Sequence, residues 1–163
     1  MQLSKKTKAR LYRHAFNAWP CIVGTGGRIT HIADDFTKLR VELSLNWRTR
    51  NAVGTIFGGS MYASTDPFYM LMLMQILGDQ YIIWDKGCTL RFRRPAMKTM
   101  HADFEVTPEM LADVKQRVAE NGSTEVVWTV CYRDDAGVTY AEFDKVLYIA
   151  TKEHYAKRKA RAR

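Results

Sequence analysis

The stretch that decides the fold begins with Asn51-Ala-Val-Gly54-Thr-Ile-Phe57-Gly58-Gly59-Ser60 and continues into an almost wholly apolar segment that ends at Leu77. A helix that is apolar all round must be enclosed on every side. We therefore expect a long central helix that begins near Gly58 and is covered by a sheet and by a second subunit. Its most hydrophobic part, 67–77, is far too short to span a membrane.

Alternating apolar and polar residues predict strands on both sides of this segment. Leu39, Val41 and Leu43 alternate with charged neighbours, as expected of a strand with one buried face. The sequence Asp-Asp-Ala-Gly at 134–137 indicates the turn of a hairpin. The predicted strands cover 28–33, 38–45, 81–93, 101–106, 123–133 and 138–150.

Two further helices are expected outside the apolar segment. One is amphipathic and covers 5–18, and the other runs from Pro108 to about Ala119 with Thr107 as its N-cap. The glycine cluster at 24–27 is interpreted as a loop, in preference to a phosphate cradle. The pattern predicts an α+β fold with about six antiparallel strands wrapped around one long apolar central helix. A single domain is expected over 21–151, between a basic N-terminal helix (1–20) and a basic C-terminal tail (152–163).

The formal net charge of +8 comes from the two ends of the chain. Without them the chain is close to neutral, so we favour solvated ends over a loose contact with phosphates or a membrane surface, and nucleic-acid binding is not expected. No signal peptide is recognised, and Cys21, Cys88 and Cys131 form no CxxC pair. They are interpreted as reduced core thiols of a cytoplasmic protein. The four histidines lack metal-ligand spacing, so no metal is expected. Trp84 and Trp128 are expected in the core.

The glycine turn and Asp66 together outline a site for acyl transfer. Backbone N–H groups at a helix start can hold a developing oxyanion, and a nearby carboxylate can act as base or nucleophile. The alternative for Asp66, which the residues alone favour, is an N-cap before Pro67. Asn51 could orient a water or close a turn. The methionines of the apolar segment are interpreted as core filler in preference to the wall of an acyl tunnel.

Taken together, Asn51, Gly54, Gly58-Gly59 and Asp66 resemble the hotdog-fold acyl-CoA thioesterases of the phenylacetate-pathway type. Segments 81–86 and 90–96 are similar to the third strand of that family and its Pro-Ala ending. The similarity is greatest to a bacterial subgroup described as tetrameric acyl-CoA thioesterase-like, or as a domain of unknown function. It covers roughly residues 21–151.

This resemblance implies hydrolysis of an acyl-CoA or related thioester. Asp66 would be the catalytic carboxylate, Gly59 and Gly58 would donate N–H groups to the thioester oxygen, and Asn51 would position water. Phe57 stands where the family usually has histidine. No cofactor is implied beyond coenzyme A as part of the substrate, and the site would lie between subunits of a homodimer or homotetramer. The residues assigned to substrate binding are Phe57, Asp85, Thr89, Arg91, Arg93 and Arg94.

Three interpretations compete with these assignments. The arginines of 91–94, with Lys98, could meet the phosphates of coenzyme A, or they could form a solvated strand face paired with acids such as Asp103 and Glu105. A non-catalytic acyl- or CoA-binding protein on the same fold is the alternative to the thioesterase. A dehydratase of this fold is disfavoured, because its usual catalytic histidine has no counterpart here.

Overall fold

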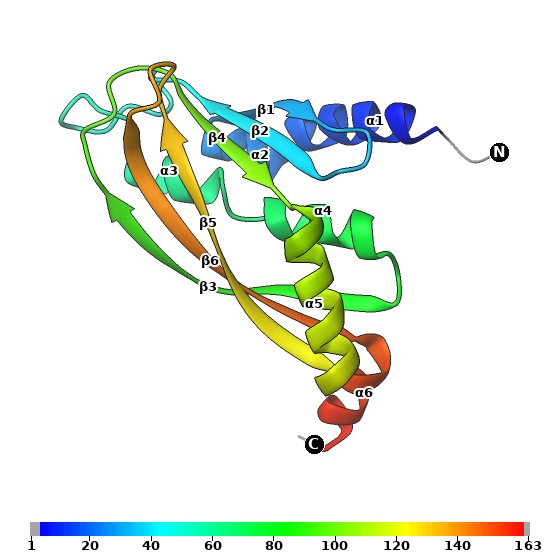
Figure 1. Ribbon diagram of the computed structural model, residues 1–163. Coiled ribbons are helices and arrows are strands. Elements are labelled where there is room, and N and C mark those ends of the chain that lie inside the picture. Colours follow the sequence, from blue (N-terminus) through cyan, green and yellow to red (C-terminus); the bar gives the residue numbers. More distant parts are fainter. Residues whose placement is uncertain (1–3, 162–163) are drawn as a thin grey trace.

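The computed structural model describes residues 4–161, which form one six-stranded antiparallel sheet and six helices (Figure 1). The strands are β1 (Gly27–Ile32), β2 (Lys38–Leu43), β3 (Tyr81–Phe92), β4 (Met100–Glu105), β5 (Ser123–Arg133) and β6 (Thr139–Thr151). The helices are α1 (Lys5–Ala18), α2 (Pro20–Thr25), α3 (Gly58–Ala63), α4 (Phe68–Leu77), α5 (Pro108–Asn121) and α6 (Lys152–Arg161). The predicted α+β fold with six antiparallel strands is confirmed.

The strands lie in the order β1-β2-β4-β5-β6-β3, and every neighbouring pair is antiparallel. The β5–β6 hairpin predicted from its turn is confirmed. β3 lies at one edge of the sheet and pairs with β6 along its length. The register shifts between Asp85 and Gly87, so a β-bulge divides β3 into two halves.

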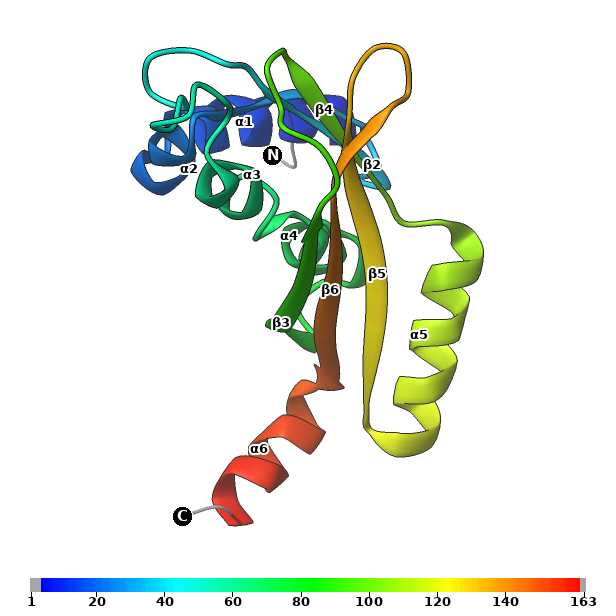
Figure 2. The same ribbon diagram turned by 90° about the vertical axis from the view of Figure 1, so that its left-hand side faces the viewer.

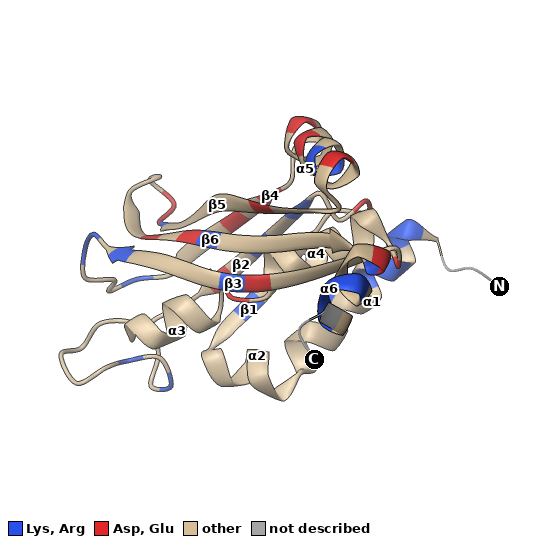
Figure 3. Ribbon diagram, turned by 90° about the horizontal axis from the view of Figure 1, so that it is seen from below, with Lys and Arg blue, Asp and Glu red and all other residues tan. Residues whose placement is uncertain are grey.

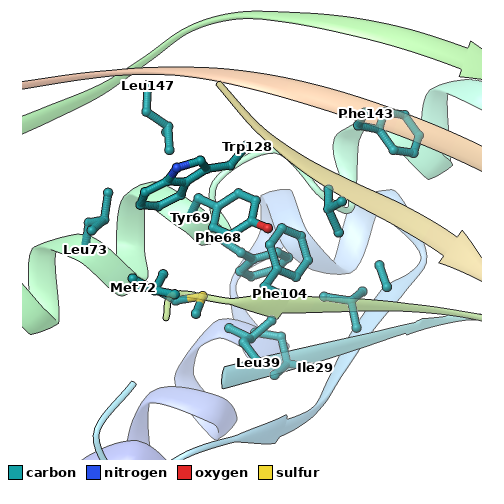
Figure 4. Close-up of a cluster of buried hydrophobic side chains, with 14 of the residues drawn as sticks. Ile29, Leu39, Phe68, Tyr69, Met72, Leu73, Phe104, Trp128, Phe143 and Leu147 are labelled. Carbon is teal, nitrogen blue, oxygen red and sulfur yellow. The ribbon is translucent and has the colours of Figure 1, made fainter. Parts of the chain in front are cut away.

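The sheet curves around α4, and the core fills the space between them (Figures 1 and 4). The ring of Tyr69 lies 5.0 Å from the ring of Phe104 and 5.2 Å from the ring of Trp128, both edge-to-face. Met72 is buried in this cluster, as core filler would be. Trp128 is buried as predicted.

α5 packs on the other face of the sheet from α3 and α4 (Figure 2). It begins at Pro108, and the Thr107 side chain accepts a hydrogen bond from the Met110 N–H, which confirms the predicted N-cap. α1 also has its predicted bounds. No helix within residues 4–161 is long and apolar enough to cross a membrane.

The apolar segment differs from its prediction, because two helices replace the one that was expected. α3 ends at Ala63 and α4 begins at Phe68, so residues 64–67 are an irregular turn. Proline lacks the N–H that a continuous helix needs and clashes with the preceding turn. Pro67 therefore interrupts the helix instead of merely bending it.

Three smaller predictions were wrong. Gly24 belongs to the short helix α2 and not to a loop, because Pro20 can start a helix and the left-handed Gly26 ends it. Trp84 is 52% exposed, since its position on β3 points away from α4. Cys21 is exposed on α2, whereas Cys88 and Cys131 are half-buried on strands.

The C-terminal segment is helical from Lys152 to Arg161 and carries most of its charge as lysine and arginine (Figure 3). At the N-terminal end of the chain, α1 begins after its N-cap Ser4 and carries the basic side chains of that segment. Residues 1–3 and 162–163, which belong to the two predicted terminal segments, lie outside the described residues.

Candidate active site

The break between α3 and α4 positions Asp66. The Ser64 hydroxyl donates to the Ser60 carbonyl (2.6 Å) and shares a 2.7 Å hydrogen bond with the Tyr132 hydroxyl of β5. These two bonds fix the end of α3 against the sheet. Asp66 comes next and belongs to neither helix. The N-cap position of α4 is occupied by Pro67, which forms no side-chain cap. The prediction that Asp66 caps a helix is therefore wrong.

The side chain of Asp66 is instead bound by a buried lysine. Lys145 Nζ donates to Asp66 Oδ1 at 2.8 Å, and the lysine side chain is 1% exposed. Lys145 comes from β6, where it occupies an inward position between Phe143 and Leu147. The Asp66 side chain is 46% exposed. The ion pair thus has its cation in the core and its carboxylate at the surface.

A second carboxylate approaches the same ammonium. Asp85 Oδ1 lies 3.4 Å from Lys145 Nζ, within ion-pair range, although no hydrogen bond to this buried oxygen is formed within residues 4–161. Asp85 stands at the bulge of β3, opposite Leu147 of β6. One ammonium thus lies between two carboxylates. The three groups come from β6, from β3 and from the break between α3 and α4.

The charges of this cluster follow from its burial and its partners. Burial raises the pKa of Asp85 above its ordinary value, even though the Lys145 charge opposes the rise. Burial would lower the pKa of Lys145, but the hydrogen bond to Asp66 and the charges of both carboxylates outweigh it, so the pKa is raised overall. Lys145 is therefore a cation at neutral pH.

A thiol also faces this cluster. Cys88 lies directly opposite Lys145 in the β3–β6 ladder. Burial raises the pKa of the Cys88 thiol despite the nearby ammonium. A thiol with a raised pKa is protonated at neutral pH and is a poor nucleophile. Cys88 is therefore a poor candidate for a nucleophile in this cluster.

The glycine turn forms the N-terminus of α3. The first helical hydrogen bond runs from the Met61 N–H to the Phe57 carbonyl, so the N–H groups of Gly58 and Gly59 precede it. Both glycines lie under aromatic rings. A Cβ at Gly58 would lie 2.6 Å from Cζ of Phe92, and one at Gly59 would overlap the ring of Phe57. Phe57 and Phe92 are themselves more than half exposed, so they form an apolar rim over the turn.

Asn51 closes the loop before this turn. Its Oδ1 accepts the N–H groups of Val53 (3.1 Å) and Thr55 (3.0 Å), and its Nδ2 donates to Thr55 Oγ1 (2.8 Å). The loop borders a cavity of about 440 Å³, whose lining includes four of the residues expected at the site or its rim. They are Asn51, Gly58, Arg93 and Arg94.

The remaining predicted substrate-binding residues lie elsewhere on β3. Thr89 and Arg91 point to the face opposite α4, where Arg91 Nη1 lies 2.8 Å from Asp144 Oδ2. Arg93 pairs with Glu142 in the same way (2.6 Å). Arg91 and Arg93 are thus paired with acids of β6, because β3 neighbours β6, whereas Arg94 donates a hydrogen bond to the Thr139 carbonyl. The expected partners Asp103 and Glu105 pair with Arg40 and Lys38 of β2.

Sequence reasoning missed Lys145, Ser64 and Tyr132. A signal for Lys145 was present, since it replaces an apolar residue on the inward face of a strand whose other inward residues are Ala141, Phe143, Leu147 and Ile149. A lysine at such a position is rarely buried without a partner. Ser64 and Tyr132 carry no comparable signal, because their contact joins segments that are 68 positions apart.

Comparison with known proteins relates the whole domain to one family model. Residues 7–149 match the model described as "Domain of unknown function (DUF4442)". No curated protein matches the chain.

Solved structures share the fold. A protein of unknown function from Pseudomonas aeruginosa, described as "Probable Thioesterase", superposes with a TM-score of 0.76 at 19% identity, over 87% of this chain and 95% of that chain. A protein with unknown function from Chlorobaculum tepidum gives a TM-score of 0.72 at 16% identity, over 92% and 98%. A thioesterase from Haemophilus influenzae gives 0.61 at 12% identity, over 93% of each chain.

Proposed function

The chain belongs to the family described as a domain of unknown function (DUF4442) and has a hotdog fold, and we propose that it hydrolyses acyl thioesters with Asp66 as the catalytic carboxylate. The resemblance to hotdog proteins seen in the sequence is confirmed, whereas the phenylacetate-type subgroup stays a prediction. The observation that carries the proposal is the ion pair of the half-exposed Asp66 with the buried Lys145.

Asp66 is arranged to act as a base toward water. Lys145 binds Oδ1, and the Tyr62 side chain lies beside the same two groups. Oδ2, the oxygen that Lys145 does not bind, accepts a proton from water while the water oxygen adds to the thioester carbonyl carbon. The C–S bond then breaks, and the leaving thiolate takes the proton from Asp66. Lys145 is a positioning residue, which fixes the rotamer of Asp66.

The glycine turn supplies the groups that receive the carbonyl oxygen. In the proposal, the N–H groups of Gly59 and Gly58 donate to the oxygen as it becomes negative, because they precede the first bonded turn of α3. Phe57 and Phe92 provide an apolar rim that excludes water from the thioester. Asn51 contributes by holding the loop that borders this rim, through its three hydrogen bonds.

A second copy of the chain completes the site in this proposal. Apolar side chains that are more than one-third exposed gather on the glycine turn and on the second half of β3, namely Phe57, Leu90 and Phe92. Covering them in a homodimer would bury apolar surface. Light scattering should give a mass that is a multiple of the protomer, and Phe92→Asp should shift it toward the monomer. A monomeric mass for the unchanged protein would contradict this part.

Steady-state hydrolysis tests the proposed activity. A panel of acyl-CoA thioesters, short, long and aromatic, is followed by release of free thiol. We expect turnover of at least one class, and we expect Asp66→Asn to reduce kcat by roughly 100-fold or more. Asp35→Asn is a matched control. Asp35 is an exposed residue of the turn between β1 and β2, where it accepts hydrogen bonds from Thr37. This turn and β3 lie toward opposite edges of the sheet.

Two outcomes would decide against the proposal. Turnover that survives in Asp66→Asn would remove Asp66 as the catalytic group. Saturable acyl-CoA binding without turnover in any variant would favour the non-catalytic acyl-binding alternative. If turnover depends on Asp66, a single turnover in ¹⁸O-labelled water tests for a nucleophilic role: label in the Asp66 carboxylate demonstrates a mixed anhydride that water opens at the Asp66 carbon.

A further inference from the structure

A second cavity lies outside the candidate active site, where α6 leaves the end of β6. Its volume is about 440 Å³, within the range of about 300 to 1,000 Å³ that is usual for small-molecule sites. Its lining comes from β3, β6 and α6 and consists of Trp84, Lys86, Tyr148, Tyr155, Arg158 and Lys159. Every one of these six residues is aromatic or basic.

We propose that this cavity binds a nucleotide, with the base against its aromatic side chains and the phosphate on its arginine and lysine. Planar aromatic rings offer faces on which a base stacks, and this stacking tolerates any base. Guanidinium and ammonium groups are the usual partners of phosphate. The combination of the two on one small concave surface fits a nucleotide better than it fits an acyl chain.

The aromatic part of the cavity is built on the sheet. Trp84 and Tyr148 are direct neighbours across β3 and β6, and the Trp84 ring is 52% exposed. The guanidinium of Arg158 lies 5.6 Å from the centre of the Tyr148 ring, so the cation is already stacked on an aromatic face. An incoming base therefore meets an exposed indole next to an oriented guanidinium.

The buried hydroxyl of Tyr148 is an independent observation. Tyr148 is 6% exposed, and its hydroxyl has no hydrogen-bond partner within residues 4–161. Buried polar atoms are usually paired, and leaving one unpaired costs free energy. A polar ligand in the cavity that Tyr148 lines would supply that partner.

The charge of the cavity is available for an anion. Lys86 is engaged by Glu125 of β5. Arg158 and Lys159 form no ion pair with any residue in the 4–161 range, and no acidic residue of that range lines the cavity. Lys157, on the same helix, is paired with Glu153 and does not line the cavity. Two cations of α6 without an ion pair among the described residues, Arg158 and Lys159, thus lie at the cavity, and the paired Lys157 lies away from it.

The position of the cavity relates it to the active site. Trp84 and Asp85 are consecutive on β3, so their side chains point to opposite faces of the sheet. Asp85 faces the Lys145–Asp66 pair, and Trp84 faces the cavity. If the proposed thioester hydrolysis is correct, the nucleotide is the adenosine end of coenzyme A, whose flexible pantetheine arm would pass the edge strand to reach Asp66. An acyl carrier protein has that arm but no nucleotide, so the cavity favours coenzyme A as the carrier.

Calorimetric titration with adenosine 3′,5′-bisphosphate, at near-physiological salt to screen non-specific attraction, tests the proposal. We expect saturable binding that Trp84→Ala and the double change Arg158→Ala/Lys159→Ala each weaken at least tenfold. Lys157→Ala, the matched control, should leave the affinity unchanged. Adenosine alone and inorganic phosphate alone should bind much more weakly than the bisphosphate. Absence of saturable binding would overturn the proposal, and so would equal weakening by Lys157→Ala, which would indicate a diffuse basic surface.

Two further arms identify the source of the nucleotide. If coenzyme A binds at least as tightly as the bisphosphate and loses affinity in the same variants, the coenzyme is the ligand. If the variants weaken only the bisphosphate, the site is one for free nucleotides. These titrations are independent of turnover, so bisphosphate binding in a protein that hydrolyses no thioester would reject the proposed function and retain the nucleotide site. A changed oligomer mass in Trp84→Ala, without any loss of bisphosphate affinity, would instead assign this surface to subunit contact.

Discussion

Lys145 reaches from β6 to Asp66 in the break between α3 and α4, with 2.8 Å between Nζ and Oδ1, although the two residues are 79 positions apart. A lysine that is 1% exposed is costly to bury unless its charge is compensated. Replacing such a pair by apolar residues often leaves stability unchanged or raised. The pair is thus better explained by what it does for Asp66 than by what it contributes to the core.

Lys145→Met should lower both activity and stability. Methionine fills much of the same volume but leaves the largely buried Asp85 without a counter-ion, so the melting temperature should fall at neutral pH. The kcat should fall roughly 10- to 100-fold, as when an outer-shell partner is lost. KM should change less than kcat, because the lysine orients Asp66 and does not touch substrate. Thiol-release kinetics and thermal melting measure the two effects. Lys38→Met, which removes an exposed ion pair with Glu105, is the control and should change neither. Equal losses of kcat in the two variants would contradict the positioning role.

Alkaline pH should remove the stability that Lys145 contributes as a cation. Its pKa is raised in the folded protein above the ordinary value of 10.5, so the contribution is fully present below 10.5 and is lost as pH rises through the folded value. The difference in melting temperature between the unchanged protein and Lys145→Met, followed from neutral to strongly alkaline pH, measures this contribution. It should shift in favour of the methionine variant above 10.5. A difference that is constant over that range would show that the charge of Lys145 is not linked to folding.

Asp85→Asn should raise stability at neutral pH. Burial raises the pKa of Asp85, so its ionised form is a cost to the folded state that is present above the folded pKa and disappears as pH falls through it. The asparagine variant should therefore melt at a higher temperature than the unchanged protein at pH 7, and this advantage should shrink in acid. Thermal melting across the acidic range measures it. A variant that is less stable at pH 7 would show that the charge of Asp85 is needed by Lys145.

Ser64→Ala should destabilise the protein more than Tyr132→Phe does. Removing the serine hydroxyl leaves the fully buried Tyr132 hydroxyl unpaired, which costs about 1–3 kcal/mol. Removing the tyrosine hydroxyl leaves Ser64 its bond to the Ser60 carbonyl. Denaturant unfolding of both single variants and the double variant gives the coupling. The double variant should be less destabilised than the sum of the singles, and strict additivity would contradict the contact.

Most of the fold was predicted from the periodicity of apolar residues along the sequence. The alternation along β2, β4, β5 and β6 placed these strands to within two residues at either end, because each buries one face. The bounds of α1 and the Thr107 cap followed equally from local signals. The apolar segment was misjudged although Ser64, Thr65 and Asp66 before Pro67 mark the end of α3, because the proline was interpreted as a bend within one long helix. Trp84 was misplaced because a large apolar residue at a sheet edge can face a surface cavity as readily as the core.

The candidate site was predicted only in part. Asp66 and the glycine turn were found because they lie within one short stretch of sequence. Asp85 was assigned to the site from the family resemblance, whereas Lys145 is brought to Asp66 by the tertiary fold, which no local pattern contains. The assigned roles of Gly59 and Asn51 stay predictions until turnover is measured, and so does the contact of the β3 arginines with substrate.

The interruption between α3 and α4 divides the apolar segment into a part that can be changed and a part that cannot. α4 is locked by the aromatic core on which the whole sheet closes, whereas α3 meets solvent through the rim of Phe57 and Phe92. If the proposed thioester hydrolysis is correct, substitutions at that rim should change which acyl groups are accepted without repacking the interior. The four-residue gap that exposes a carboxylate would then make this fold a tractable scaffold for redesign of that chemistry.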